Sequence, residues 1–468
     1  HHQNRTDEPM TELDTEALCA TQPLISEIAQ QVCQEFKLDS VVWGLVGGQQ
    51  LLTSGAAGSI SDLSTRYRIA SMTKSFTAAA VLSLRDEGVL SIDLPVDEYA
   101  PELETICRTE SGTRVTLRHL LSMSSGLATD DPWADRHLDA TAEEMNDLYR
   151  QGARYAFSPG THFEYSNLGF ALIGRVVERV TGRRVRDFVD ERLLQPLQMS
   201  ATTWDPPLDH TWAPPTRVQD GQIIPDGTDP LRDGEIAPMG GLWTTVDDLA
   251  RWVMWLNEAN SNTDSQTARL NVASRRDMQV MHTYAGVIAL DGDKAPTGYG
   301  YGLMMRDDPD LGIVNSHSGG LPGYGSNMRW VAGRSIGVVA MSNTTYAPMA
   351  IFTHRVLKML NAAKLIPAAS TSVAPVLQQR SEQLVALINQ WDTDQAKKIF
   401  ADNVHLDESF ERRCDAAQKM IAESGPALIQ AIVATSNTEA VIFLTNSKKI
   451  EILIGPLHSG PIQWYEVK

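Results

Sequence analysis

The chain has 468 residues and a mass of 51.4 kDa, and its 58 acidic and 40 basic side chains give a formal net charge of −18 at pH 7. This excess of negative charge repels nucleic acids and anionic membrane surfaces, so we expect neither as a partner. The sequence also lacks a run of about 18 apolar residues, the length that a membrane-spanning helix requires.

The first 21 residues are interpreted as a tag remnant followed by an N-terminal extension. His1-His2-Gln3-Asn4-Arg5 resembles an expression tag, and the residues after it lack the basic and then apolar order of a secretory signal. A signal that has been cleaved is absent from such a sequence. We therefore expect a periplasmic or secreted protein and leave a cytoplasmic one open.

The cysteines are too few for a disulfide framework, and none has the C-x-x-C spacing of a metal or redox site: Cys19, Cys33, Cys107 and Cys414. Cys19 and Cys33 can pair if the protein is exported. We favour buried free thiols, because free cysteine is among the most buried residue types.

Residues 22–366 are predicted to form one α+β domain. A four-residue apolar repeat predicts a helix over 23–37, and 41–56 has the pattern of two strands joined at Gly47-Gly48. Further helices are predicted at 71–87, 117–123, 167–181, 185–194, 246–257 and 349–363, and a hairpin of strands at 328–332 and 336–341. Strands at both ends of a helical middle favour one antiparallel sheet flanked by helices, with a mostly helical subdomain.

A smaller domain is predicted at the C-terminus. Residues 367–375 are rich in small residues and proline, a composition typical of linkers. In 376–468 we expect helices at 376–391 and 416–423, and then strands at 428–435, 440–445, 449–454 and 462–467. This order predicts a small α+β domain with an antiparallel meander.

Ser71-Met72-Thr73-Lys74 is the first group of residues suited to catalysis. Residues three apart on a helix share a face, so the Lys74 amine can reach the Ser71 hydroxyl. A serine attacks well once a base takes its proton, and burial can lower the pKa of a lysine enough for that task. The helix N-terminus also directs backbone N–H groups at a developing oxyanion. Alone, the pattern also fits a solvated lysine on an ordinary helix.

Tyr165-Ser166-Asn167, before a predicted helix, is the only Tyr-x-Asn in the chain. In an extended loop Tyr165 and Asn167 point the same way. A phenol with a pKa near about 10 becomes a proton shuttle when a neighbouring cation such as Lys74 favours the phenolate. Asn167 either hydrogen-bonds both Lys74 and a substrate amide or serves only as the N-cap of the helix.

His317-Ser318-Gly319-Gly320 follows at the edge of the predicted sheet. Glycines there let the backbone approach a substrate closely and present an N–H group. His458-Ser459-Gly460 repeats the H-x-G pattern near the C-terminus, so the pattern alone is weak. The strand pair and further glycines around His317 favour the first copy.

In this order, the three groups resemble the serine β-lactamase and penicillin-binding protein family, whose signature is S-x-x-K with later motifs. The resemblance covers about residues 22–363 and includes 120–127, 240–250 and 323–326. It implies that Ser71 is acylated and that Lys74 and Tyr165 exchange the proton, with either as the base. Asn167, His317, Ser318 and Gly319 would then contact substrate, and the N–H groups of Ser71 and Gly320 would form the oxyanion hole.

One departure from the family pattern bears on substrate. True class C β-lactamases and most transpeptidases carry Lys-Thr-Gly where this chain has His317-Ser318-Gly319. A lysine there is permanently charged and suits a substrate carboxylate, whereas histidine is mostly neutral at pH 7. The histidine form, like the extra C-terminal domain, resembles the D-aminopeptidase, D-amino-acid amidase and carboxylesterase branch.

We therefore predict a serine hydrolase that forms an acyl-enzyme on a small-molecule or peptide substrate, a D-amino-acid peptide or amide or a carboxylic ester. A class C-like β-lactamase or a DD-carboxypeptidase is the alternative enzyme. A non-catalytic binder of cell-wall peptides or acyl groups is the alternative of another class, and the joint presence of the motif residues argues against it. A homo-oligomer is one possible assembly, and the C-terminal domain either narrows access to the pocket or serves packing.

Rival chemistries have less support. Gly333-Arg334-Ser335-Ile336-Gly337 matches the nucleophile elbow, but Ser335 falls between two strand-like runs, and the elbow requires a strand and then a helix. The sequence has neither H-E-x-x-H nor a cysteine and histidine cluster that suits a metal, and no phosphate-binding loop. Acyl transfer without a cofactor therefore fits best.

Overall fold

In the computed structural model of the protein, the described residues are 12–209, 211–227, 229–261, 268–369 and 372–468. The proposed tag remnant, 1–5, lies outside them, as do residues 370 and 371 of the expected linker. The chain divides into two compact units, Glu12–Ile366 and Pro367–Lys468. The larger unit starts at Glu12 rather than at residue 22, because helix α1 buries Leu18 in its core.

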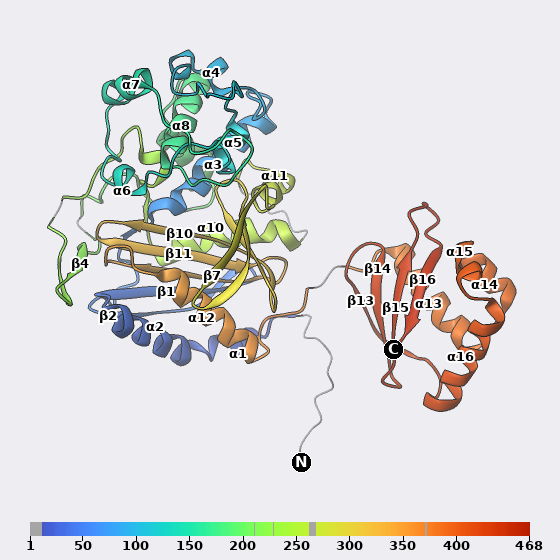
Figure 1. Ribbon diagram of the computed structural model, residues 1–468. Coiled ribbons are helices and arrows are strands. Elements are labelled where there is room, and N and C mark those ends of the chain that lie inside the picture. Colours follow the sequence, from blue (N-terminus) through green and yellow to red (C-terminus); the bar gives the residue numbers. More distant parts are fainter. Residues whose placement is uncertain (1–11, 210, 228, 262–267, 370–371) are drawn as a thin grey trace. The chain divides into compact units, whose positions relative to one another are not determined.

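An eight-stranded antiparallel sheet runs through the larger unit (Figure 1). The strand order is β2-β1-β12-β11-β10-β9-β8-β7, so the first strands of the chain pair with the last strand of the unit. The predicted sheet built from both ends of the domain is thus confirmed. Its strands are β1 Ser40–Gly47, β2 Gln50–Gly58, β7 Thr283–Leu290, β8 Asp293–Tyr299, β9 Met304–Asp308, β10 Gly312–Leu321, β11 Tyr324–Val331 and β12 Ile336–Ser342.

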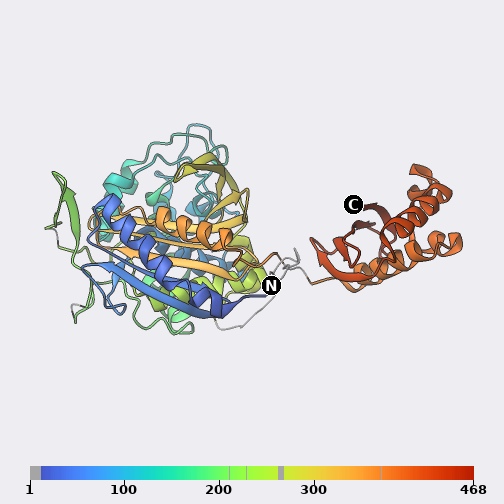
Figure 2. The ribbon, with the colours of Figure 1, turned by 90° about the horizontal axis from the view of Figure 1, so that it is seen from below.

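Helices cover both faces of this sheet. Alternate side chains of a strand point to opposite faces, and β1 shows this clearly: Trp43 and Leu45 join one core cluster, while Val42 joins the other. On the first face lie α1 Thr15–Cys19, α2 Gln22–Phe36 and α12 Met349–Ala362. Figure 2 shows α2 and α12 side by side across the strands, and α10 (Val246–Glu258) packs on the opposite face.

Beyond α10 the larger unit is mainly helical, as expected (Figure 1). Its helices are α3 Thr73–Asp86, α4 Val96–Tyr99, α5 Leu117–Leu121, α6 Asp131–Ala134, α7 Ala142–Gln151, α8 Asn167–Thr181, α9 Val185–Val189 and α11 Val272–Met278. Short turns of helix occur at Ala70–Met72, Pro101–Leu103, Asp190–Leu194, Ala237–Met239 and Ala259–Ser261. Two small strand pairs complete the unit: β3 Tyr67–Arg68 with β6 Trp243–Thr244, and β4 Thr216–Gln219 with β5 Gln222–Pro225.

The smaller unit has helices followed by an antiparallel meander, which confirms the α+β prediction. Its strands pair in sequence order: β13 Ile429–Ala434, β14 Glu439–Leu444, β15 Lys449–Ile454 and β16 Ile462–Val467. Its helices are α13 Pro375–Asn389, α14 Thr393–Ile399, α15 Asn403–Asp407 and α16 Phe410–Ser424. They share an aliphatic core with one face of the sheet, centred on Leu384, Ile442 and Ile450.

All four cysteines are free thiols. The expectation that they are buried holds only for Cys107, since Cys19 is exposed and Cys33 and Cys414 are partly exposed. The Cys19 thiol donates a hydrogen bond to the carbonyl of Leu52 at 3.3 Å. Within the described ranges, none of the helices is both long and apolar enough to cross a bilayer.

Candidate active site

Ser71 lies in a strained turn that precedes α3. The turn, Ala70–Met72, holds Ala70 at φ 50°, a left-handed conformation that costs a residue with a Cβ about 1–2 kcal/mol. Ser326 of β11 helps to hold it, because its hydroxyl donates to the carbonyl of Ile69 at 3.0 Å. Such strain persists only where the surroundings enforce it, and it often marks a functional position.

Lys74 lies one helical turn beyond Ser71 and is fully buried. Its Nζ is 2.8 Å from Ser71 Oγ, 2.6 Å from Asn167 Oδ1 and 2.9 Å from the carbonyl oxygen of Met239. The last two oxygens can only accept hydrogen bonds. A neutral Lys74 amine can therefore give both its hydrogens to them, which leaves its lone pair for the Ser71 hydroxyl.

The surroundings of Lys74 favour the neutral form of its amine. Burial lowers the pKa of Lys74 from 10.5 to about 7, because the charged form is poorly solvated. Three carboxylates oppose this effect and raise the pKa of Lys74: Asp131, Asp135 and Asp130. Burial prevails, so a large fraction of Lys74 is unprotonated near neutral pH and can accept a proton.

Tyr165 contacts the same two groups. Its hydroxyl hydrogen-bonds the Ser71 side chain, and its ring centroid is 4.9 Å from Lys74 Nζ. Burial raises the pKa of Tyr165 well above 10, although the hydrogen bond to Ser71 opposes this. The prediction that a neighbouring cation favours the phenolate is therefore wrong. Tyr165 therefore holds its proton more firmly than Lys74 does.

Asn167 connects Lys74 to the carboxylates. The N-cap of α8 is Ser166, whose hydroxyl accepts the N–H of Gly169 at 3.0 Å, so the Asn167 side chain is not the cap. Its Oδ1 accepts from Lys74, and its Nδ2 donates to Asp130 Oδ1 at 3.2 Å and to Asp131. Asn167 is completely buried. The expected contact with Lys74 is present, but no atom of Asn167 is open to a substrate.

Residues 317–321 of β10 border Ser71. The sequence predicted a position at the sheet edge, but β10 is an interior strand. Its pairing with β9 ends at Ser316, however, so this segment pairs only with β11. A Cβ on Gly319 would lie 2.0 Å from the carbonyl oxygen of Ile69, so only glycine lets the strand come this close to the nucleophile turn.

His317 is neutral in this position. Its Nδ1 is 2.6 Å from the carbonyl oxygen of Ser318, which only accepts, so Nδ1 carries the hydrogen. Its Nε2 therefore accepts from the Tyr299 hydroxyl at 2.8 Å. Burial, together with the charge of Lys74, lowers the pKa of His317 to about 3. His317 thus offers no positive charge to a substrate.

A cavity of about 390 Å³ opens at Ser71. Its walls include predicted site residues, namely Ser71, Tyr165, His317, Ser318, Gly319 and Gly320, and Lys74 lies buried next to Ser71. Sequence reasoning missed the walls made by Asp131, Asp135 and Tyr346, which sit in loops or a one-turn helix with no recognisable motif. Only Asn167, of the predicted substrate contacts, is absent from the lining.

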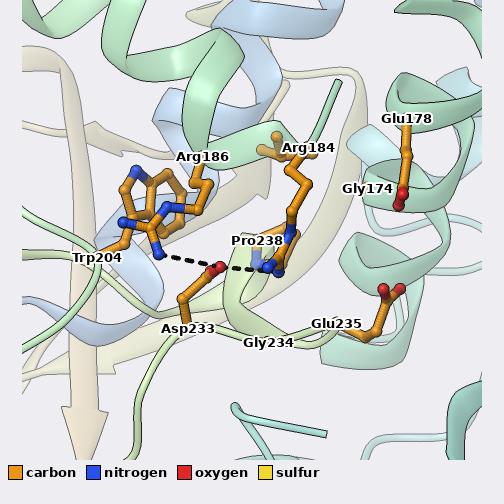
Figure 3. Close-up of a pocket in the computed structure, with 10 residues that line it drawn as sticks. Gly174, Glu178, Arg184, Arg186, Trp204, Asp233, Gly234, Glu235 and Pro238 are labelled. Carbon is orange, nitrogen blue, oxygen red and sulfur yellow. Dashed lines mark hydrogen bonds and ion pairs between the residues drawn. The ribbon is translucent and has the colours of Figure 1, made fainter. Parts of the chain in front are cut away.

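A second cavity has no such chemistry (Figure 3). Its volume of about 20 Å³ is room for little more than a water molecule. Arg184 and Arg186 both point at Asp233, at 2.8 Å and 3.4 Å, so their charges are already paired. In the part of the chain that the structure describes, no cluster of three His, Cys, Asp or Glu residues is arranged to hold a metal ion.

Ser335, the rival nucleophile, lies in the turn between β11 and β12. A strand follows it, and the nucleophile elbow requires a helix there. Ser335 is also absent from the lining of the cavity at Ser71. The geometry therefore gives no support to the rival reading.

Comparison with known proteins agrees with the motifs. A family model described as Beta-lactamase matches residues 28–359. Protein flp of Staphylococcus aureus (strain MW2) is 25% identical over 327 residues, 68% of this chain and 60% of that protein. Beta-lactamase-like protein 2 of Dictyostelium discoideum is 29% identical over 361 residues, 72% of this chain and 62% of that protein. The chain thus spans less than two thirds of the length of these relatives.

Solved structures share the fold. The octameric penicillin-binding protein homologue from Pyrococcus abyssi has a TM-score of 0.61 at 19% identity, covering 95% of this chain and 89% of that one. A D-stereospecific amidohydrolase from Streptomyces sp. has a TM-score of 0.57 at 23% identity, covering 71% and 98%. The penicillin-binding protein from Bacillus halodurans has a TM-score of 0.55 at 22% identity, covering 70% and 98%. The resemblance seen in the sequence is confirmed, and the chain belongs to the beta-lactamase family.

Proposed function

We propose that the protein is a serine hydrolase that forms an acyl-enzyme on Ser71. The single observation that carries the proposal is the 2.8 Å contact between Ser71 Oγ and the buried Lys74 amine, whose pKa is about 7, beside an open cavity. A nucleophile, a base within hydrogen-bond reach and room for a substrate are the three parts that acyl transfer needs.

In the first half of the reaction, Lys74 takes the proton of Ser71 and the serine oxygen attacks the substrate carbonyl carbon. The N–H groups of Ser71 and Gly320 stabilise the oxyanion. Lys74 then returns the proton, directly or through the Tyr165 hydroxyl, to the leaving amine or alcohol. In the second half, water gives a proton to Lys74 and attacks the ester carbonyl carbon. The bond to Ser71 Oγ then breaks, Lys74 returns the proton to that oxygen, and the carboxylic acid is released.

The finer proposal is that the substrate is a D-amino-acid amide or peptide, or a carboxylic ester. The neutral His317 supports it, since the described residues that line the cavity then include no cation to bind the carboxylate of a β-lactam or DD-peptide. The likeness in fold to a D-stereospecific amidohydrolase points the same way. Class C-like β-lactamase or DD-carboxypeptidase activity is the alternative that the family membership keeps open.

Intact-mass spectrometry tests the proposal. We expect p-nitrophenyl acetate to leave one acetyl group on the protein, located on Ser71, and Ser71→Ala to abolish both the adduct and turnover. Ser335→Ala, at the rival serine, is the matched control and keeps both. Full turnover by Ser71→Ala would refute the proposal, and binding without any adduct would favour a non-catalytic binder.

An exported location and self-association belong to the same proposal. The octameric solved homologue supports self-association. Light scattering of the purified chain should give a mass that is a multiple of 51.4 kDa. A 51.4 kDa monomer would contradict self-association. Protein expressed with its signal should be found outside the cytoplasm on cell fractionation, and a cytoplasmic fraction would contradict export.

A further inference from the structure

The cavity at Ser71 is lined by acidic side chains and not by basic ones among the described residues. Two carboxylates, Asp131 and Asp135, form part of its wall, and its lining contains no lysine or arginine among the described residues. His317, the remaining titratable nitrogen on the wall, is neutral. A substrate carboxylate would be repelled here, whereas a protonated amine would be attracted.

Asp135 is the carboxylate with a free oxygen. Its side chain is 5% exposed, and its Oδ2 accepts the Tyr346 hydroxyl at 2.7 Å. Over the described ranges, no hydrogen bond reaches its Oδ1 and no ion pair includes it, although Arg136 is its neighbour in sequence. Burial raises the pKa of Asp135 to about 6, although the hydrogen bond from Tyr346 and the charge of Lys74 oppose the rise. Buried carboxylates are usually paired with a cation or a hydrogen-bond donor. A ligand with a positively charged donor can supply that partner to Asp135 Oδ1.

Asp131 has a different task. Its Oδ1 accepts from Asn167 Nδ2, and Asn167 in turn accepts from Lys74. Asp131 is therefore linked to the base, and changing it would disturb catalysis itself. The Asp135 side chain hydrogen-bonds only Tyr346 among the described residues. Its charge also raises the pKa of Lys74, but that effect is common to two substrates of one variant and cancels in the ratio of their kcat/KM values.

Resting on the proposed function, we infer that Asp135 is a specificity-determining residue that binds a free, protonated amine on the acyl part of the substrate. When the first peptide bond of an unblocked peptide is hydrolysed, the amino-terminal residue, which carries the ammonium, becomes the acyl group on Ser71. The rest of the peptide, which carries the carboxylate, is the leaving group. A cavity wall that attracts the ammonium and repels the carboxylate favours aminoacyl amides and esters with a free α-amine.

The test compares D-alanine p-nitroanilide with its N-acetyl derivative on the full chain at pH 7.5. The free amine should raise kcat/KM by about 10- to 100-fold, the usual effect of a hydrogen bond to a charged group. Asp135→Asn keeps the acceptor for Tyr346 and should reduce that ratio at least tenfold, mainly through KM. Asp139→Asn, an exposed carboxylate four positions later, is the matched control and should leave the ratio unchanged.

A second readout needs only the wild-type protein. D-alanine amide should inhibit p-nitrophenyl acetate turnover more strongly than N-acetyl-D-alanine amide, and added salt should reduce the difference. Equal inhibition, no inhibition by either amide, or an unchanged ratio in Asp135→Asn would overturn the inference. These results leave Ser71-dependent acetate turnover intact, whereas failure of the proposed function removes that turnover.

Discussion

Replacement of Lys74 by methionine should inactivate the protein and yet stabilise it at low pH. Lys74 is completely buried, and burial holds its pKa at about 7 instead of 10.5. Below pH 7 both the folded and the unfolded chain carry its proton, so the folded state bears the full cost of a buried cation. Methionine has a similar shape and cannot ionise, so the variant avoids this cost.

The size of the effect follows from the pKa. A fall from 10.5 to about 7 corresponds to about 5 kcal/mol, at about 1.4 kcal/mol for each tenfold change. The variant leaves Asn167 Oδ1 and the Met239 carbonyl without this donor, at a cost of about 1–3 kcal/mol each. With about 2 kcal/mol for each of these two groups, we expect a gain of about 1 kcal/mol at pH 6. Between pH 7 and 10.5 Lys74 is deprotonated in the folded wild type and still protonated in the unfolded chain, so the stability of the wild type rises with pH. The stability difference between the variant and the wild type therefore reverses sign.

Scanning calorimetry of the full chain at pH 6 and pH 10, following the transition of the larger unit, measures this. The change in the stability difference between the two pH values should be about 4 kcal/mol, and it does not depend on the lost hydrogen bonds. Lys364→Met, at an exposed lysine after α12, is the control and should follow the wild type. Parallel pH curves for Lys74→Met and the wild type would refute the reasoning.

Three further outcomes can be measured directly. For an uncharged ester, kcat/KM should rise with pH through about 7 and then level off, because Lys74 must lose its proton to act as the base; an acid limb with no inflection between pH 5 and 9 would contradict this. Gly319→Ala places a Cβ 2.0 Å from the Ile69 carbonyl oxygen, so it should displace β10 and reduce kcat about 100-fold in ester assays. Glu258→Ala removes an ion-pair partner, at 2.8 Å, of the fully buried Arg275, and calorimetry should show a loss of about 3 kcal/mol.

The sequence predicts the fold where local patterns and packing agree. The hairpin of β11 and β12 and the helix α8 follow from apolar periodicity that the structure buries. The hairpin of β7 and β8 was missed, because its apolar side chains, such as Val287 and Ile288, are largely exposed and show no clean alternation. Asp291-Gly292, both at positive φ in its turn, is the signal that could have found it.

The sequence predicts those residues of the site whose type and spacing the chemistry of acyl transfer requires. Ser71 and Lys74 are placed by helical spacing alone, so their contact follows from the sequence. Asp135 meets Tyr346 across 211 positions, through loops whose paths no local pattern determines. The pKa of Tyr165 was misjudged for a related reason: the sequence reveals a nearby cation, but burial, which raises the pKa, depends on the whole fold.

The charge of the cavity also couples binding of the substrate ammonium to the pKa of Lys74. Asp131 and Asp135 raise the pKa of Lys74, which burial lowers. A substrate ammonium bound at Asp135 would neutralise part of that negative charge and so lower the pKa of Lys74 further. Because kcat reports the enzyme–substrate complex, its acid inflection should lie at lower pH for D-alanine p-nitroanilide than for p-nitrophenyl acetate. Stopped-assay pH profiles of both substrates test this, and coincident inflections would show that binding of the amine and activation of Ser71 are independent.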